Sequence, residues 1–249
     1  MKKHELFLKR IKKLSRENVV GDILNEKLCG KRVEIVGPSD NENGKEIDEF
    51  DVIIRLNTVL EYFPFTKELK RKFGSRTDII YSRGSPLKKY YGDDKLWKSV
   101  PPELKIIRSI VGHDKKIMAG SYNYPAYFKK LGLDITEVLC PETIKFVDNA
   151  LQLEKGSNLK SRTGLVPIIE SVMCGAKEVK VFNMTFYHGG TNVFRKDSVQ
   201  ELNPKTYHTG KKTSEHDSYV ELKLFKILMK NYPSISVDEK LRTIITKGK

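Results

Sequence analysis

Short apolar runs alternate with polar segments along most of this chain of 249 residues. Runs rich in valine and isoleucine that stop at polar or glycine-containing segments predict β-strands. They occupy residues 31–39, 50–57, 77–81, 105–111 and 178–182, and we expect a further edge strand at 241–245. Apolar positions at helical spacing predict helices at 161–174 and 216–230. Strands that alternate with helices favour a single α/β domain.

The stretch from residue 187 to 215 is polar, rich in glycine, asparagine, lysine and threonine, and lacks a sustained apolar period. A segment of this length inside a compact domain is usually a functional lid or a disordered loop. We therefore expect a lid at about 188–215.

Composition narrows the class of protein. A hydrophobic fraction of 39% and a charged fraction of 31% are typical of globular proteins and exclude a disordered chain or a polytopic membrane protein. The sequence has no apolar run of membrane-spanning length and no secretory signal, so we expect a cytoplasmic location. Three widely spaced cysteines, Cys29, Cys140 and Cys174, disfavour a disulfide scaffold and a zinc site.

The net charge of +14 is concentrated at one end of the chain. Residues 1–16 contain seven lysines and arginines and one glutamate, and Phe7, Ile11 and Leu14 follow helical spacing. This pattern predicts a basic amphipathic helix. Such a helix can lie on an anionic membrane surface, or its apolar stripe can pack on the domain. Both alternatives remain open from the sequence.

Two strand ends carry residues that suit a nucleotide. Gly37-Pro38-Ser39 ends the first strand, where backbone amides can approach a phosphate, although the turn is neither a GxGxxG nor a P-loop motif. Arg55 and Asn57 end the second strand and offer a charge and an amide. The alternative for Arg55 is an exposed side chain on a capped strand.

A predicted helix start and a later strand end add two more candidates. Thr163-Gly164 opens the helix at 161–174, and free amides at a helix start favour a phosphate or carboxylate. A plain N-cap is the alternative. Tyr187 follows the strand at 178–182, where its hydroxyl could donate to a leaving phosphate. The alternative is that its ring packs in the protein interior.

His188, His208 and His216 fall in or beside the polar segment. His216 opens the last predicted helix, with Glu221 five residues later. A neutral imidazole is a suitable base for a hydroxyl, and a carboxylate can hold its tautomer. The alternative is that His216 only caps the helix. No regular spacing of metal ligands occurs, so we expect no essential metal.

Four segments together resemble the sialyltransferases of glycosyltransferase family 29, with some similarity to the bacterial family 42 enzymes. Residues 31–58 resemble the large sialylmotif, and residues 161–188 resemble the small one. Tyr207-His208 stands where the third motif is expected, and HDSYVE at 216–221 matches the His-x4-Glu of the very small motif.

The resemblance implies an inverting, metal-independent transferase that uses a CMP-activated sugar. It implies a single Rossmann-like domain with a variant GT-A fold. His216 would be the general base, His208 would belong to the third motif, and Tyr187 aligns with a tyrosine that steadies the leaving phosphate in family 42. We expect the donor site to contain Gly37, Ser39, Asn41, Arg55, Asn57, Thr163, Gly164 and Glu221.

The chain departs from the family pattern at several positions. Pro38 replaces the asparagine of the large motif, which would move that nucleotide contact to Asn41 or Asn43. Val33 stands where animal members have a cysteine, so a bridge between Cys29 and Cys174 is not expected.

These observations lead to one working hypothesis with two alternatives. We expect residues 1–20 to form the basic helix and residues 21–249 to form a transferase domain that moves sialic acid from CMP-sialic acid to a glycan, glycolipid or polysaccharide. The first alternative is the same mechanism with CMP-Kdo as the donor. The second is a basic nucleic-acid-binding protein, which is disfavoured because the basic excess is concentrated in one helix and no nucleic-acid-binding motif is present. The expected partners are therefore the nucleotide sugar, the acceptor and a peripheral membrane contact through residues 1–16.

Overall fold

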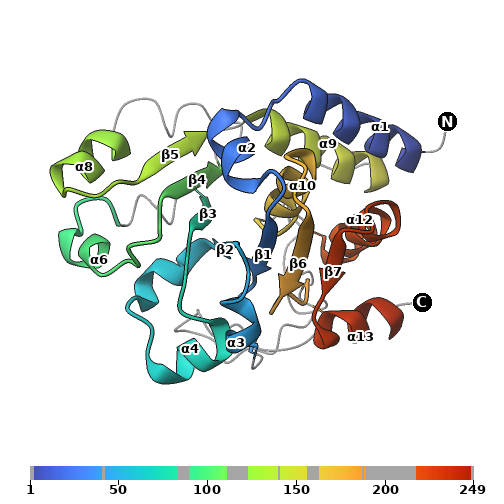
Figure 1. The fold of residues 1–249 in the computed structure, drawn as a ribbon. Helices are drawn as coiled ribbons and strands as arrows, with labels where there is room; N and C mark the ends of the chain where they lie inside the picture. The colour runs from blue at the N-terminus through green and yellow to red at the C-terminus, as the bar shows by residue number, and fades with distance from the viewer. Residues whose placement is uncertain are drawn as a thin grey trace.

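The computed structural model describes residues 3–40, 43–83, 90–110, 123–139, 141–155, 163–186, 188 and 217–247. Within these residues, seven parallel strands form one sheet with the order β5-β4-β3-β2-β1-β6-β7 (Figure 1). The strands are β1 (Arg32–Val36), β2 (Val52–Leu56), β3 (Ile79–Arg83), β4 (Ile106–Ile110), β5 (Thr136–Leu139), β6 (Glu178–Phe182) and β7 (Ile235–Val237). The α/β class and the strands expected before residue 183 are confirmed.

The strand order reverses beside β1. The chain builds outward from β1 to β5, then returns to the other side of β1 with β6, whose residues 178–182 pair with residues 32–36. In open parallel sheets, ligands bind beyond the carboxyl ends of the strands at such a reversal. The fold therefore directs attention to the ends of β1 and β6.

Helices cover both faces of the sheet. One face, with Val33, Ile35 and Tyr81, packs under α1 (Lys3–Arg16), α2 (Asp22–Leu28), α9 (Pro141–Lys155), α10 (Leu165–Met173) and α12 (Ser218–Asn231). The other face, with Val36 and Ile53, packs under α3 (Gly44–Ile47), the 3₁₀ helix η1 (Asn57–Tyr62), α4 (Lys67–Phe73), α6 (Asp94–Lys98) and α8 (Tyr124–Lys130). Because both faces are covered, the inner strands are apolar almost throughout.

The expected edge strand at 241–245 is wrong. These residues lie in helix α13 (Glu239–Lys247), and the edge strand is β7, a few residues earlier. Leu241, Ile244 and Ile245 are spaced i, i+3, i+4, which is a helical period in a run too short to distinguish by eye. Asp238 fixes the helix start, because its Oδ1 accepts the Leu241 amide at 2.8 Å.

Helix α1 packs its apolar stripe onto the domain. Phe7, Ile11 and Leu14 are buried in the core, and the Phe7 ring stacks on Phe146 of α9 with centroids 5.3 Å apart. The Ser15 hydroxyl also donates to the Met173 carbonyl at the end of α10 (2.6 Å). The packing alternative is therefore confirmed, because the stripe packs on the domain and α1 is not a separate helix that inserts it into a membrane.

Across the residues with described structure, no helix is long and apolar enough to cross a bilayer.

Candidate active site

Three segments meet at the strand-order reversal: the turn after β1, the segment after β6 and the first turn of α10. A Cβ placed on Gly37 would lie 2.4 Å from the Asn183 carbonyl oxygen and 2.9 Å from the Met184 Cα. A Cβ on Gly164 would lie 3.0 Å from the Met184 sulfur. Met184 thus contacts both glycines that the sequence singled out, and the structure brings them together as expected.

The Gly37-Pro38-Ser39 turn has a different role from the one expected. The Gly37 amide donates to the Phe182 carbonyl and the Ser39 amide to the Asn183 carbonyl, both at 2.8 Å. Proline has no amide hydrogen, so the turn continues the pairing of β1 with β6 and offers none of these amides to a phosphate. Gly37 is needed because the two backbones approach so closely that a side chain would not fit.

Asn183 is the residue that joins this edge of the sheet together, and the sequence did not identify it. It is fully buried with a positive φ of 54°, a conformation that asparagine tolerates better than most residues. Its side chain donates to the Lys72 carbonyl (3.1 Å) and accepts from Asn43 (3.2 Å). Its backbone amide donates to Asp238 Oδ2 at 2.7 Å. Asp238 therefore links the β6 end to the start of α13.

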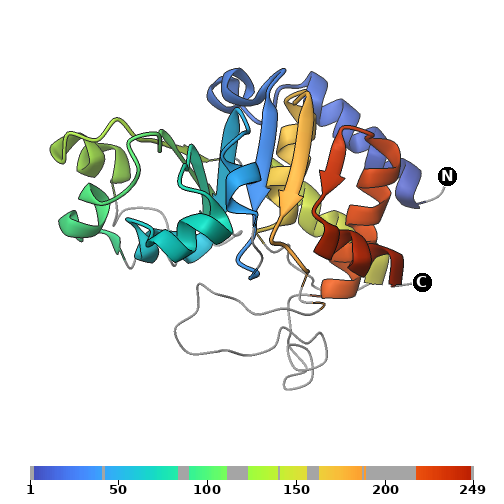
Figure 2. The same ribbon diagram turned by 60° about the horizontal axis from the view of Figure 1, so that its bottom comes forward.

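Two lysines surround the turn after β1. Lys240 of α13 donates to the Ser39 hydroxyl (3.2 Å) and to the Asp40 carbonyl (2.9 Å), and Lys72 of α4 pairs with the Asp40 carboxylate (3.1 Å). Figure 2 shows the ends of β1 (blue) and β6 (gold) pointing to one side, with α13 (dark red) beside them. Ser39 is 1% exposed and serves this network, which corrects its expected place as a direct nucleotide contact.

The start of α10 is held in place by a buried ionic cluster. Arg108 of β4 forms a bidentate pair with Glu170 of α10, with N–O distances of 3.0 and 2.5 Å, and the Tyr81 hydroxyl donates to the same carboxylate at 2.7 Å. Burial, and then the adjacent Glu170 charge, raise the pKa of Tyr81 well above its ordinary value. The cluster fixes α10 against the sheet, and with it the buried Thr163 and the half-buried Gly164 at its start.

Helix α12 begins beside the segment that follows β6. Phe186 packs on Phe225 with ring centroids 5.0 Å apart, and His188 meets Tyr219 edge to face at 4.7 Å. These two contacts lie on either side of position 187 in the chain. Glu221 is on the first turns of α12 and is 2% exposed, so it faces the protein interior.

The N-cap of α12 is Asp217, whose carboxylate accepts the amides of Tyr219 (3.0 Å) and Val220 (3.2 Å). The expected helix therefore starts two residues later than the sequence suggested. This observation removes the main alternative role of His216, because the helix has a cap without it.

Backbone strain and an unpaired hydroxyl mark the segment after β6. Phe186 has a φ of 48°, which is costly for a bulky residue and occurs most often at functional sites. The Thr185 hydroxyl is buried and has no hydrogen-bond partner among the residues that the structure describes. Both residues lie in the chain between Met184, which lies against Gly164 at the start of α10, and the contacts with α12.

Arg55 is corrected from a nucleotide contact to a core residue. Its side chain is 1% exposed and donates to the Arg76 carbonyl and the Thr77 hydroxyl, with its guanidinium 5.1 Å from the centre of the Phe65 ring. Alternation along β2 places it with Ile53 on the face covered by η1 and α4. The next expected contact, Asn57, begins η1.

Asn41, Tyr187, His208, His216 and the expected lid at 188–215, apart from His188, lie outside the described residues. Asn43, the other expected substitute for the family asparagine, donates to Asn183 and Asp238. No disulfide joins Cys29 and Cys174. No group of metal-binding side chains occurs in the described ranges.

No protein family model and no curated protein sequence matches this chain. Solved structures of two Campylobacter jejuni sialyltransferases are similar to it. One, a variant of Cst-II in complex with CMP, has a TM-score of 0.50 and 16% identity over 83% of this chain and 80% of that chain. The other, the monofunctional α-2,3-sialyltransferase Cst-I, has a TM-score of 0.51 and 19% identity over 83% and 74%. The chain therefore has the Rossmann-like α/β fold seen in these glycosyltransferases.

Proposed function

We propose that this chain is an inverting sialyltransferase that moves sialic acid from CMP-sialic acid to a hydroxyl of a glycan acceptor without a metal. The observation that carries the proposal is the meeting of the β1 turn, the β6 end and the α10 start at the strand-order reversal. These are the segments that resemble the large and small sialylmotifs. The shared fold with a CMP-bound sialyltransferase supports the same conclusion.

In this proposal, the donor binds at the first turn of α10, and Thr163 and Gly164 lie at the CMP phosphate. Amides and the helix dipole at that end stabilise the negative charge that grows as CMP departs. Tyr187, which follows the strained Phe186, would donate its hydroxyl to the same phosphate. Lys240, which donates to the Ser39 hydroxyl and the Asp40 carbonyl, adds positive potential near the β1 turn, which favours an anionic nucleotide and an anionic sugar.

In the reaction, the acceptor oxygen forms a bond to the anomeric carbon as the bond from that carbon to the CMP phosphate breaks. The phosphate leaves with the bonding electrons, and the hydroxyl proton passes to His216. Because attack occurs opposite the leaving group, configuration inverts. Asp217 caps α12, so the helix does not need His216 as its cap, and Glu221 would orient the imidazole. His208 would complete the acceptor side, as the third motif implies.

The test is to incubate the purified protein with CMP-sialic acid and with CMP-Kdo separately, with and without galactoside acceptors, and to follow CMP release in the presence and absence of a chelator. We expect chelator-resistant release from CMP-sialic acid that the acceptor stimulates. CMP release from CMP-Kdo and not from CMP-sialic acid would show that the donor is CMP-Kdo. Release from neither would refute the transferase.

The roles of the residues can be tested with matched pairs. His216→Ala should lower transfer about 10²- to 10⁴-fold while CMP binding persists, whereas His4→Ala on α1 should change neither. Gly37→Ala should weaken CMP binding much more than Gly164→Ala, because its Cβ would meet backbone atoms and the other would meet a flexible thioether. Near-normal transfer by the His216 variant would refute the assigned base.

A further inference from the structure

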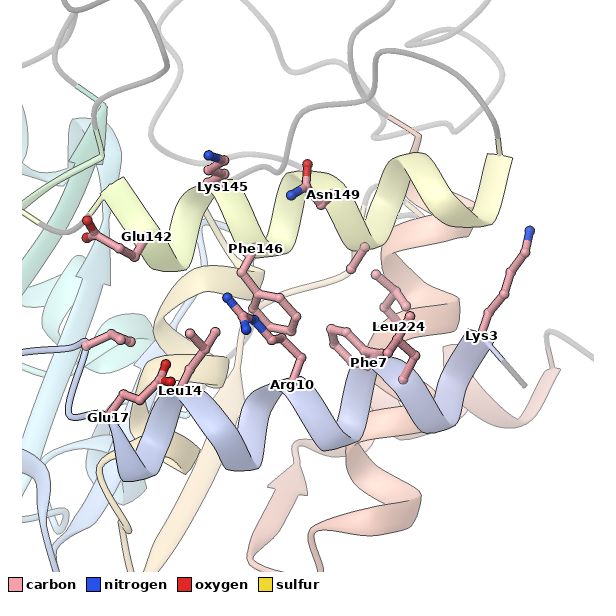
Figure 3. A pocket seen from close by; sticks show the side chains of 13 residues that line it. Lys3, Phe7, Arg10, Leu14, Glu17, Glu142, Lys145, Phe146, Asn149 and Leu224 are labelled. Atoms are coloured by element: carbon pink, nitrogen blue, oxygen red, sulfur yellow. The ribbon is translucent and has the colours of Figure 1, made fainter. Parts of the chain in front are cut away.

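A groove of about 450 Å³ lies between α1 and α9, away from the candidate active site. Its walls include Leu6, Phe7 and Leu14 of α1, Phe146 and Ala150 of α9, and Leu224 of α12. Figure 3 shows Phe7 and Phe146 meeting between the two helices, with Arg10 beside them and Lys3 at one end. The volume is within the range of small-molecule sites, about 300–1,000 Å³.

The groove is apolar inside and mostly basic outside. Leu6 is 46% exposed beside it, although the other large apolar residues of α1 are buried or half-buried. The exposed side of α1 carries one acidic residue, Glu5, and six basic ones: Lys3, Lys9, Arg10, Lys12, Lys13 and Arg16. Glu17 and Glu142 stand at the end of the groove opposite Lys3 (Figure 3). An occupant therefore needs a hydrocarbon part and an anionic part near Lys3 and Arg10.

We propose that this groove and the basic side of α1 bind anionic phospholipid at a membrane surface. Hydrocarbon enters between α1 and α9, and headgroup phosphates lie against Lys3 and against Arg10, which are about two helical turns apart. Exposed leucine beside a row of cations is the pattern of an interfacial site. A free phosphate would leave the apolar walls without a partner, and a neutral lipid would leave the basic side chains without one.

This site differs from the membrane contact that the sequence suggested. The apolar stripe of α1 is committed to the core, so α1 does not insert. Instead, α1 and α9 together form the lipid-binding surface, which depends on the folded domain. The inference does not depend on the transferase activity.

The test measures binding to phosphatidylcholine vesicles with and without phosphatidylglycerol. The wild-type protein should bind only the anionic vesicles. The double variant Lys3→Glu and Arg10→Glu should lower the partition coefficient at least about 20-fold, because each basic residue at an anionic surface contributes roughly fivefold. Leu6→Ser should lower it by about fivefold without changing charge. All three positions are exposed, and a thermal melt verifies folding.

A matched control reverses Lys129 and Lys130 at the end of α8, which are exposed and lie on the opposite face of the sheet. It changes the net charge by the same amount and should keep at least half of the wild-type binding. An equal loss in this control would overturn the site, since binding would then follow net charge alone. Unchanged binding by Leu6→Ser, binding to both vesicle types, or binding to neither would overturn it as well.

Discussion

Two buried pairs of arginine and glutamate lie on opposite faces of the sheet, and they are built differently. On the face under α10, Arg108 and Glu170 form a bidentate pair, and the Tyr81 hydroxyl donates to the carboxylate. On the face under α3 and α4, the fully buried Glu34 has no hydrogen-bond partner for either carboxylate oxygen in the described part of the chain.

The environment of each glutamate explains the difference. Burial raises the pKa of Glu34 well above its ordinary value of 4.5, more than the nearby Arg55 charge lowers it. Arg55 instead donates to the Arg76 carbonyl and to Thr77, and burial lowers its pKa to about 10. The ion pair of Arg108 and Glu170 therefore joins α10 to the sheet. In contrast, Arg55 bonds to other groups, and Glu34 favours its neutral form.

The largest expected effect is that of breaking the paired cluster. Arg108→Met should lower the free energy of unfolding by about 3–5 kcal/mol, because it leaves the Glu170 carboxylate buried without its partner. Urea unfolding measures this loss. Adding Glu170→Leu should restore part of the stability, since two apolar side chains need no pairing, while the Tyr81 hydroxyl loses its acceptor. A double variant as unstable as Arg108→Met would contradict this account.

Tyr81→Phe should have the next largest effect. It removes a hydrogen bond to a charged carboxylate, which typically contributes about 1.5–3 kcal/mol. Tyr232→Phe is the matched control, because the buried Tyr232 hydroxyl finds no partner in the ranges that the structure covers. Thermal or urea unfolding should show a loss for the first variant and none for the second. Equal losses would show that the hydroxyl of Tyr81 contributes nothing specific.

Arg55→Met should cost less than Arg108→Met, about 1–2 kcal/mol. It removes the hydrogen bonds to Arg76 and Thr77, but it leaves no obligatory charge behind because Glu34 can remain protonated. A double-mutant cycle with Glu34→Gln should give a coupling energy under about 0.5 kcal/mol. A coupling as large as that of Arg108 with Glu170 would show that the two pairs are equivalent.

The smallest effect, and one of opposite sign, is expected of Glu34→Gln. Near pH 4 its stability should match the wild type within about 0.5 kcal/mol, since an acid and an amide of the same shape are then both neutral. Because folding raises the pKa of Glu34, the folded wild type holds a proton that the unfolded chain releases above pH 4.5. The wild type should therefore lose stability relative to the variant as pH rises above that value.

Urea unfolding of both proteins at pH 4, 6 and 8 measures this difference. A wild type that gains stability over the Glu34 variant with rising pH would show that Glu34 is ionised and paired.

The sequence predicted the strands and helices around the candidate site but only some of the contacts between their residues. Apolar runs are local signals, so β1, β2 and β6 and the start of α10 were found from them. The sequence singled out Gly37 correctly but assigned it the wrong role, that of donating its amide to a ligand. Its actual role is to allow the close approach of the Asn183 backbone, which depends on which strand neighbours β1. Asn183 and Asp238 are 55 residues apart, and nothing local signals their hydrogen bond.

Arg55 shows the limit most clearly. Its place at the end of a strand indicated an exposed charge, yet both faces of this sheet are covered by helices, so the side chain is buried. The same limit applies to α1, whose pattern suited a membrane and the domain equally until the packing on α9 and α10 was known.

The sequence by itself determined the α/β class, most of the strands and the chemical types gathered near the strand ends. Period and composition carry this information because they depend only on neighbours along the chain. Only the tertiary structure decided which charges are paired, what covers the apolar stripe of α1, and that β1 and β6 lie side by side. These outcomes depend on the order of strands in the sheet, which brings Arg108 to Glu170 across 62 positions of sequence.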